Sequence, residues 1–153
     1  MSSTPSTQTE DFTEVLQLPA SPATVLAFFT SAAGVSRWWG RTEGDGAVGG
    51  MLSTSFGEHG ANTMRVLESG PTRVVWEIIT SEGITPTGHT QEWLGTTIEF
   101  DIVPAGTGTE LRFRHAGLNP RLACWNDCFA GWTHFMASIQ TLAETGTGTP
   151  FVV

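Results

Sequence analysis

The sequence has no lysine and no tyrosine among its 153 residues, and its seven basic residues are all arginine. Without lysine the chain cannot form a Schiff base, anchor pyridoxal phosphate or build a Walker-type phosphate site, and without tyrosine it has no phenolic acid or base. The formal net charge of −8 argues against nucleic acid or an anionic membrane as partner, because both require clustered positive charge. Whole classes of reaction and partner are thereby excluded.

Long apolar runs are missing too, and cysteine is scarce. No stretch approaches the roughly 18 residues of a membrane span, and the N-terminus lacks a charged-then-apolar signal. The two cysteines, Cys124 and Cys128, lie one helical turn apart, where a disulfide is geometrically awkward. We expect both to be thiols packed in a core, and the protein to be cytoplasmic without a membrane span.

The length suits a single domain with a full hydrophobic core. Residues 1–9 are small and polar without periodicity, which predicts a disordered leader. We expect residues 10–146 to form the domain and residues 147–153 to form a C-terminal tail.

The densest apolar pattern in the chain runs from Asn119 to Gly146 and predicts one long helix. Its apolar residues step by threes and fours: Leu122, Trp125, Phe129, Trp132, Met136, Ile139 and Ala143, with Cys128, Phe135 and Leu142 widening the stripe. Asn119 can cap the start, Pro120 suits the first helical position and Gly146 can end the helix. At ~1.5 Å per residue the helix would be about 35 to 40 Å long, so we expect it to lie across a curved sheet.

Two short helices are predicted before the middle of the chain. Ser21 and Pro22 form a cap and first turn for a helix that ends near Gly34. A second short helical turn then presents the pair Trp38 and Trp39.

Alternation of apolar and polar residues predicts six strands. They cover residues 11–18, 51–56, 62–68, 73–80, 96–103 and 110–115. Glu43–Gly50 is expected to be a turn-rich loop, and Ser81–Glu92 a mobile loop at one end of the sheet. The predicted fold is α+β, a helix-grip in which a curved six-stranded antiparallel sheet surrounds the long C-terminal helix, with two short helices after strand one.

The last two strands each have one apolar and one charged face. On the charged faces, the carboxylates of Glu99 and Asp101 can pair with Arg112 and Arg114. The apolar face carries His115 inward, toward the long helix.

Several local patterns follow one another in a characteristic order: PASPATVLAFFT after the first strand, SRWWG after the short helices, GG before the second strand, GTELRFRHAGL in the last strand and GW at Gly131-Trp132. In this order they resemble the START-like helix-grip superfamily (SRPBCC), and within it the branch similar to the C-terminal domain of the activator of heat-shock protein 90 ATPase, over about residues 10–146. The resemblance implies a cavity that holds lipids, sterols, polyketides or other apolar molecules. In a minority of members it implies cyclisation, dehydration or hydrolysis there.

We expect a small apolar molecule to bind between sheet and helix, among aromatic side chains that face inward. The expected lining is Trp38, Trp39, Trp76, Phe100, Phe113, His115, Phe129, Trp132, Phe135 and Met136. His115 and a tryptophan N–H would orient the polar end of the molecule.

Two other functions stay open. The first is a polyketide cyclase or hydrolase in which His115, the best catalytic candidate, works with a cavity water; the alternative for His115 is a histidine hydrogen-bonded within the core. Glu77 is solvent-facing if Trp76 faces the cavity, and would be a buried general base if the register shifted by one. The second function is a protein-interaction module resembling the chaperone activator, with a filled core, and a homodimer is one expected assembly.

No metal or other cofactor is expected. Cys124, Cys128, His115 and His134 have metal-ligand residue types, but a thiol pair four residues apart on a helix lacks the second pair that structural zinc sites show. The GTGTP run follows a helix instead of opening one, so it does not fit a dinucleotide site.

Overall fold

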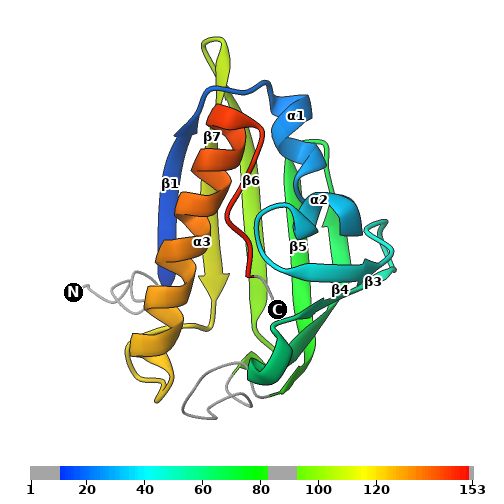
Figure 1. The fold of residues 1–153 in the computed structure, drawn as a ribbon, viewed down its shortest axis with the longest axis vertical. Coiled ribbons are helices and arrows are strands. Elements are labelled where there is room, and N and C mark those ends of the chain that lie inside the picture. Colours follow the sequence, from blue (N-terminus) through cyan, green and yellow to red (C-terminus); the bar gives the residue numbers. More distant parts are fainter. Residues whose placement is uncertain (1–10, 83–92, 152–153) are drawn as a thin grey trace, which may run out of the picture.

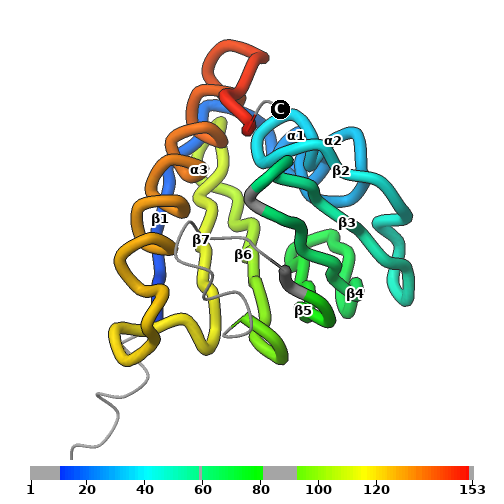
Figure 2. Tube along the Cα trace, turned by 60° about the horizontal axis from the view of Figure 1, so that its bottom comes forward, coloured from blue at the N-terminus to red at the C-terminus, as the bar shows by residue number. Residues whose placement is uncertain are grey.

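One open antiparallel sheet and one long helix form the main body of the protein in a computed structural model that describes residues 11–82 and 93–151 (Figure 1). The sheet has seven strands in the order β1-β7-β6-β5-β4-β3-β2. In chain order these are β1 Phe12–Leu18, β2 Arg41–Gly44, β3 Met51–Ser55, β4 Ala61–Ser69, β5 Arg73–Glu82, β6 Thr97–Ala105 and β7 Gly108–Ala116. The sheet bends across its width, and helix α3, Trp125–Thr145, lies against its concave face (Figure 2). The α+β arrangement with a C-terminal helix is therefore confirmed.

The sheet has one strand more than predicted. β2 pairs with β3 from Arg41 opposite Ser55 to Gly44 opposite Leu52. The loop that we expected to begin at Glu43 therefore begins after Gly44. Only one of the four β2 residues is buried, so the segment has no alternation to detect.

Two short helices follow β1, as predicted. Helix α1, Pro22–Ala27, and helix α2, Ala32–Ser36, are each capped by a serine, Ser21 and Ser31, whose hydroxyl accepts the N–H three residues on. α1 ends earlier than expected because Ser31 starts a separate helix. A Cβ on Gly34 would lie 2.1 Å from the carbonyl oxygen of the last α1 residue, so the close approach of the two helices requires glycine.

Helix α3 is shorter than predicted. It begins at Trp125, and the segment from Asn119 onward forms turns in which the Asn119 side-chain oxygen accepts the Arg121 N–H at 3.0 Å. The predicted end is confirmed, because Gly146 takes a left-handed φ of 86° and its N–H donates to Leu142. The 21 residues of α3 make a helix about 31 Å long at ~1.5 Å per residue.

The remaining predictions concern the segments outside these elements. The expected leader, residues 1–9, and residues 83–92 of the expected mobile loop lie outside the described residues. A 3-10 turn, Gly57–His59, links β3 to β4. Across residues 11–82 and 93–151, no helix is long and apolar enough to cross a membrane.

Candidate functional site

The concave face of the sheet, the α1–α2 segment and α3 enclose a layer of aromatic side chains. Eight of the ten predicted lining residues lie in this layer, each at most 2% exposed: Trp38, Trp39, Trp76, Phe100, Phe113, His115, Trp132 and Met136. The sheet contributes four of them, the segment after α2 contributes Trp38 and Trp39, and α3 contributes Trp132 and Met136.

Near-parallel indole rings fill the centre of the layer. Trp39 stacks on Trp38, Trp76 and Trp132 with ring centroids 5.5, 6.0 and 5.3 Å apart, and Trp132 stacks in turn on Trp93 at 5.9 Å. These five side chains are each at most 4% exposed. Within residues 11–82 and 93–151, the place where we expected a cavity holds indole rings that pack against one another.

Two predicted lining residues lie elsewhere. Phe129 is 47% exposed on the outer edge of α3, where its ring packs 5.3 Å from Phe12 and 5.4 Å from Trp125. Its expected place in the lining is wrong, because each residue turns a helix by about 100° and the buried stripe runs through the preceding Cys128 instead. Phe135 is half-buried and packs on Phe56 of the β3–β4 connection at 6.1 Å.

His115 is buried and held by hydrogen bonds at both ring nitrogens. Its Nδ1 lies 3.0 Å from the Trp132 indole nitrogen and its Nε2 lies 2.8 Å from Thr96 Oγ1. An indole N–H can only donate, so Nδ1 must accept and the ring proton is on Nε2. The Thr96 hydroxyl accepts a hydrogen bond from this Nε2–H and donates one to the Trp93 carbonyl oxygen at 2.6 Å.

Within this network His115 is a neutral imidazole. Burial lowers its pKa from 6.5 to about 3. With both nitrogens engaged, the ring has no free site for a substrate proton, which matches the core-histidine alternative. Sequence reasoning missed Trp93 and Thr96 as its supports; strand alternation from Ile98 could have placed Thr96 on the inner face, whereas Trp93 precedes the strand and has no periodicity to place it.

Trp76 differs from its neighbours in its indole nitrogen. The indole N–H groups of Trp38, Trp93 and Trp132 donate to a backbone carbonyl, a thiol sulfur and an imidazole respectively. The Trp76 Nε1 is buried and has no hydrogen-bond partner among residues 11–82 and 93–151. Leaving such a donor unsatisfied costs roughly 1–3 kcal/mol, so the Trp76 N–H is suited to an acceptor supplied by a bound molecule.

Glu77 lies on the opposite face from Trp76, across from Arg65 of β4. The register that would have buried this carboxylate is therefore not the one the protein adopts. Cys124 and Cys128 are buried thiols that are not joined in a disulfide, and His134 Nε2 lies 3.0 Å from the Thr149 carbonyl oxygen. Within the described ranges no three histidine, cysteine, aspartate or glutamate side chains converge as a metal site.

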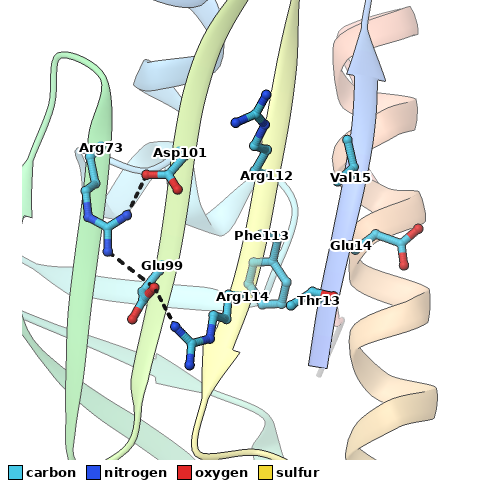
Figure 3. A pocket seen from close by; sticks show the side chains of 9 residues that line it. All are labelled: Thr13, Glu14, Val15, Arg73, Glu99, Asp101, Arg112, Phe113 and Arg114. Atoms are coloured by element: carbon cyan, nitrogen blue, oxygen red, sulfur yellow. Dashed lines mark hydrogen bonds and ion pairs between the residues drawn. The ribbon is translucent and has the colours of Figure 1, made fainter. Parts of the chain in front are cut away.

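A hollow of about 360 Å³ lies on the convex face of the sheet (Figure 3). Its lining comes from four neighbouring strands: Thr13, Glu14, Val15, Arg73, Glu99, Asp101, Arg112, Phe113 and Arg114. Arg73 bridges Asp101 at 2.6 Å and Glu99 at 3.2 Å, and Arg114 lies 3.9 Å from Glu99. The hydrogen bond to Asp101 raises the pKa of Arg73.

The ion pairs on this face differ in part from those predicted. The pair of Glu99 with Arg114 is confirmed, but Asp101 bonds Arg73 and Arg112 bonds Glu110 of its own strand at 2.5 Å. Each arginine that faces the hollow already has a carboxylate partner. We therefore assign no ligand to the hollow.

Comparison with known proteins identifies relatives of the whole fold. The sequence profile of the activator of Hsp90 ATPase homolog 1-like proteins matches residues 19–144. The solution structure of the Aha1 dimer from Colwellia psychrerythraea is 25% identical, with 90% of this chain and 98% of that chain covered and a TM-score of 0.74. Comparison with curated protein sequences finds no match.

Two further similar structures show the fold alone. DynU16, from the dynemicin biosynthetic locus, is 16% identical over 91% of this chain and 49% of its own, with a TM-score of 0.69. CalU16 from Micromonospora echinospora is 18% identical over 90% of this chain and 75% of its own, with a TM-score of 0.64.

Proposed function

The chain belongs to the family of activator of Hsp90 ATPase homolog 1-like proteins, and from its interior we propose that it binds a small, flat, apolar molecule between the sheet and α3. The observation that carries this proposal is the buried Trp76 N–H, which has no acceptor among the residues described. A guest with a carbonyl or a similar acceptor would supply the missing partner. Its apolar body would lie against the indole rings around Trp39.

The aromatic layer offers enough contact area for useful affinity. Burying apolar groups contributes ~0.8 kcal/mol per CH₂, so a molecule of about ten carbons could bind at micromolar strength. Because the rings are packed together, the interior must open first, and the apparent affinity falls by the fraction of molecules that are open. We expect this binding to take place in the cytoplasm.

We do not extend the proposal to catalysis. A general acid or base needs a titratable atom within reach of the substrate. Both ring nitrogens of His115 are occupied by Trp132 and Thr96, and the low pKa keeps the ring neutral at physiological pH.

Fluorenone and fluorene share a flat tricyclic body, but only fluorenone carries a carbonyl, so the two molecules test the Trp76 N–H. We expect wild type to bind fluorenone about 2 to 13 times more tightly than fluorene, from one hydrogen bond of ~0.5–1.5 kcal/mol. In Trp76→Phe, which keeps a ring and removes the donor, the two affinities should become equal. Titration of tryptophan fluorescence gives both affinities, and the indole N–H signal of Trp76 should move downfield in ¹H–¹⁵N spectra with fluorenone alone.

The ratio of the two affinities is compared between wild type and Trp76→Phe. The smaller ring of the variant weakens the binding of both compounds alike, so it does not change this ratio. The preference for fluorenone surviving in that variant would show that Trp76 is not the recognition group. Failure of both compounds to bind wild type would overturn the proposal as a whole.

A homodimer is the second candidate, and exposed Phe129 is the observation that favours it. This ring and the neighbouring Trp125 form an apolar patch on α3, backed by Phe12. Large exposed apolar groups gathered in one place mark interaction sites. The similar Aha1 protein from Colwellia psychrerythraea is a dimer, so we propose a second copy of this chain as the occupant of the patch.

Phe129→Ser should convert the dimer to a monomer. Light scattering after size-exclusion chromatography at ~100 µM should give wild type twice the chain mass of 16.4 kDa and the variant the single mass, because a dimer related by twofold symmetry loses the ring on both sides. Met51→Ser, at an exposed apolar residue of β3, is the matched control and should stay dimeric. A monomeric wild type, or a dimeric Phe129→Ser, would argue against this interface.

A further inference from the structure

The chain does not leave the domain after α3 ends. Residues 146–151 return over the concave side of the sheet and run between α3 and the α1–α2 side of the molecule (Figures 1 and 2). We call this segment the strap. It has no helix or strand of its own, so its position depends on contacts with other elements.

On one side the strap is fastened to α3. The Thr149 N–H donates to Ser138 Oγ at 2.8 Å, and the Thr149 carbonyl lies 3.0 Å from His134 Nε2. The buried Ser138 hydroxyl donates in turn to the Trp38 carbonyl at 2.8 Å. One serine therefore joins the helix, the strap and the segment that carries the tryptophan pair.

On the other side the strap is fastened to the segment after α2. The Phe151 N–H donates to the Trp39 carbonyl at 2.9 Å, and Arg37 donates to the Gly146 carbonyl at 3.2 Å. A Cβ on Gly148 would lie 2.4 Å from the Arg37 carbonyl oxygen, so the strap lies directly against this segment. It thus bridges the two walls of the interior.

The ring of Phe151 reaches the aromatic layer through Phe56. It packs 5.8 Å from Phe56, which packs 5.6 Å from Trp39 and 6.1 Å from Phe135. Trp39 is the ring on which Trp38, Trp76 and Trp132 stack. Removing the strap would uncover Phe56, whose ring packs against Trp39.

We propose that the strap is the gate of the interior: it closes the route to the Trp39 stack and admits a ligand when it lifts. The ligand part of this inference rests on the proposed function. A few hydrogen bonds and one half-buried ring hold the strap, whereas the interior is held by the whole core. Segments with few contacts open far more often than the domain unfolds, so the strap opens first.

Three variants loosen the strap to different extents: removal of residues 147–153, Phe151→Ala and Ser138→Ala. Thr133→Ala is the matched control, because this hydroxyl on the same helix donates to the Phe129 carbonyl within α3 itself. The first measurement needs no ligand and follows hydrogen exchange of the Trp76 indole N–H by NMR. We expect exchange at least tenfold faster after truncation, several-fold faster in the two substitutions and unchanged in the control.

The second measurement follows entry of the neutral fluorescent probe N-phenyl-1-naphthylamine by stopped flow, and its association rate should rise in the same order. Faster exchange without probe uptake would support the strap and overturn the proposed ligand site. Unchanged exchange in variants that are folded by circular dichroism would overturn the strap. If the truncated chain does not fold, the exchange rate of the Trp76 indole N–H in Phe151→Ala and Ser138→Ala decides whether the strap is the gate.

Discussion

Trp132→Ala is expected to lower the free energy of unfolding by about 3–5 kcal/mol, the range for removing a large buried aromatic ring. Trp132 is 2% exposed and contacts Trp39, Trp93 and Phe113, so its loss opens a hole in the middle of the stack. It also removes the donor to His115 Nδ1 and leaves a buried acceptor without its partner. Urea denaturation followed by far-UV circular dichroism at pH 7 measures the change.

Two further variants separate these causes. Trp132→Phe keeps a ring but loses the N–H, so it should cost roughly 1–3 kcal/mol, mainly through the unsatisfied imidazole nitrogen. Leu67→Ala, at a residue that is 41% exposed, should cost less than about 1 kcal/mol. A Trp132→Ala protein as stable as Leu67→Ala would mean that the stack does not hold the core together.

The strands near the end of the chain show how much of the fold was predictable. In β6 and β7, strict alternation identified the inner face, and the structure places Ile98, Phe100, Phe113 and His115 on it. Period-two alternation is decisive here because a slip of one residue would expose every apolar side chain. For β5 the sequence left two registers open, and the structure adopts the one in which Trp76 is buried and Glu77 lies on the opposite face.

The candidate site was predictable only in composition. Sequence periodicity says which face a residue lies on, but it does not say whether the rings on that face stack on one another or line a space. The stacking of Trp39 depends on the distance between the sheet and α3, which many side chains set together. Phe129 was misplaced for a related reason, since a stripe of apolar residues wider than the buried face has edges that only packing can define.

The strap lay beyond prediction because its contacts are made by backbone groups. Thr149 and Phe151 are held mainly through their N–H and carbonyl groups, which carry no sequence signal. The glycine and threonine composition of residues 146–149 is equally typical of a solvated loop. The side chain that helps to hold the segment is Ser138, which accepts the Thr149 N–H. A single small polar residue on an apolar helix face does not by itself predict such a contact.

The stability of the protein should fall in mild acid because of His115. Its folded pKa is about 3 while its ordinary value is 6.5, so between these pH values the unfolded chain binds a proton that the folded protein does not. Stability therefore rises with pH across this window; it is lost as pH falls from about 6.5 toward 3, and above 6.5 the group has no further effect. Each pH unit well inside the window is worth up to about 1.4 kcal/mol.

His115→Gln removes this titration and keeps a neutral polar side chain. Between pH 6 and pH 4 the wild type should lose roughly 2 kcal/mol more stability than the variant, measured by urea denaturation at several pH values. The side chains that face the imidazole, Thr96, Trp93 and Trp132, do not titrate in this range, so the difference between the two slopes reports His115 itself. Equal slopes would show that the imidazole can take up a proton without leaving the core, and the argument against His115 as an acid or base would then fail.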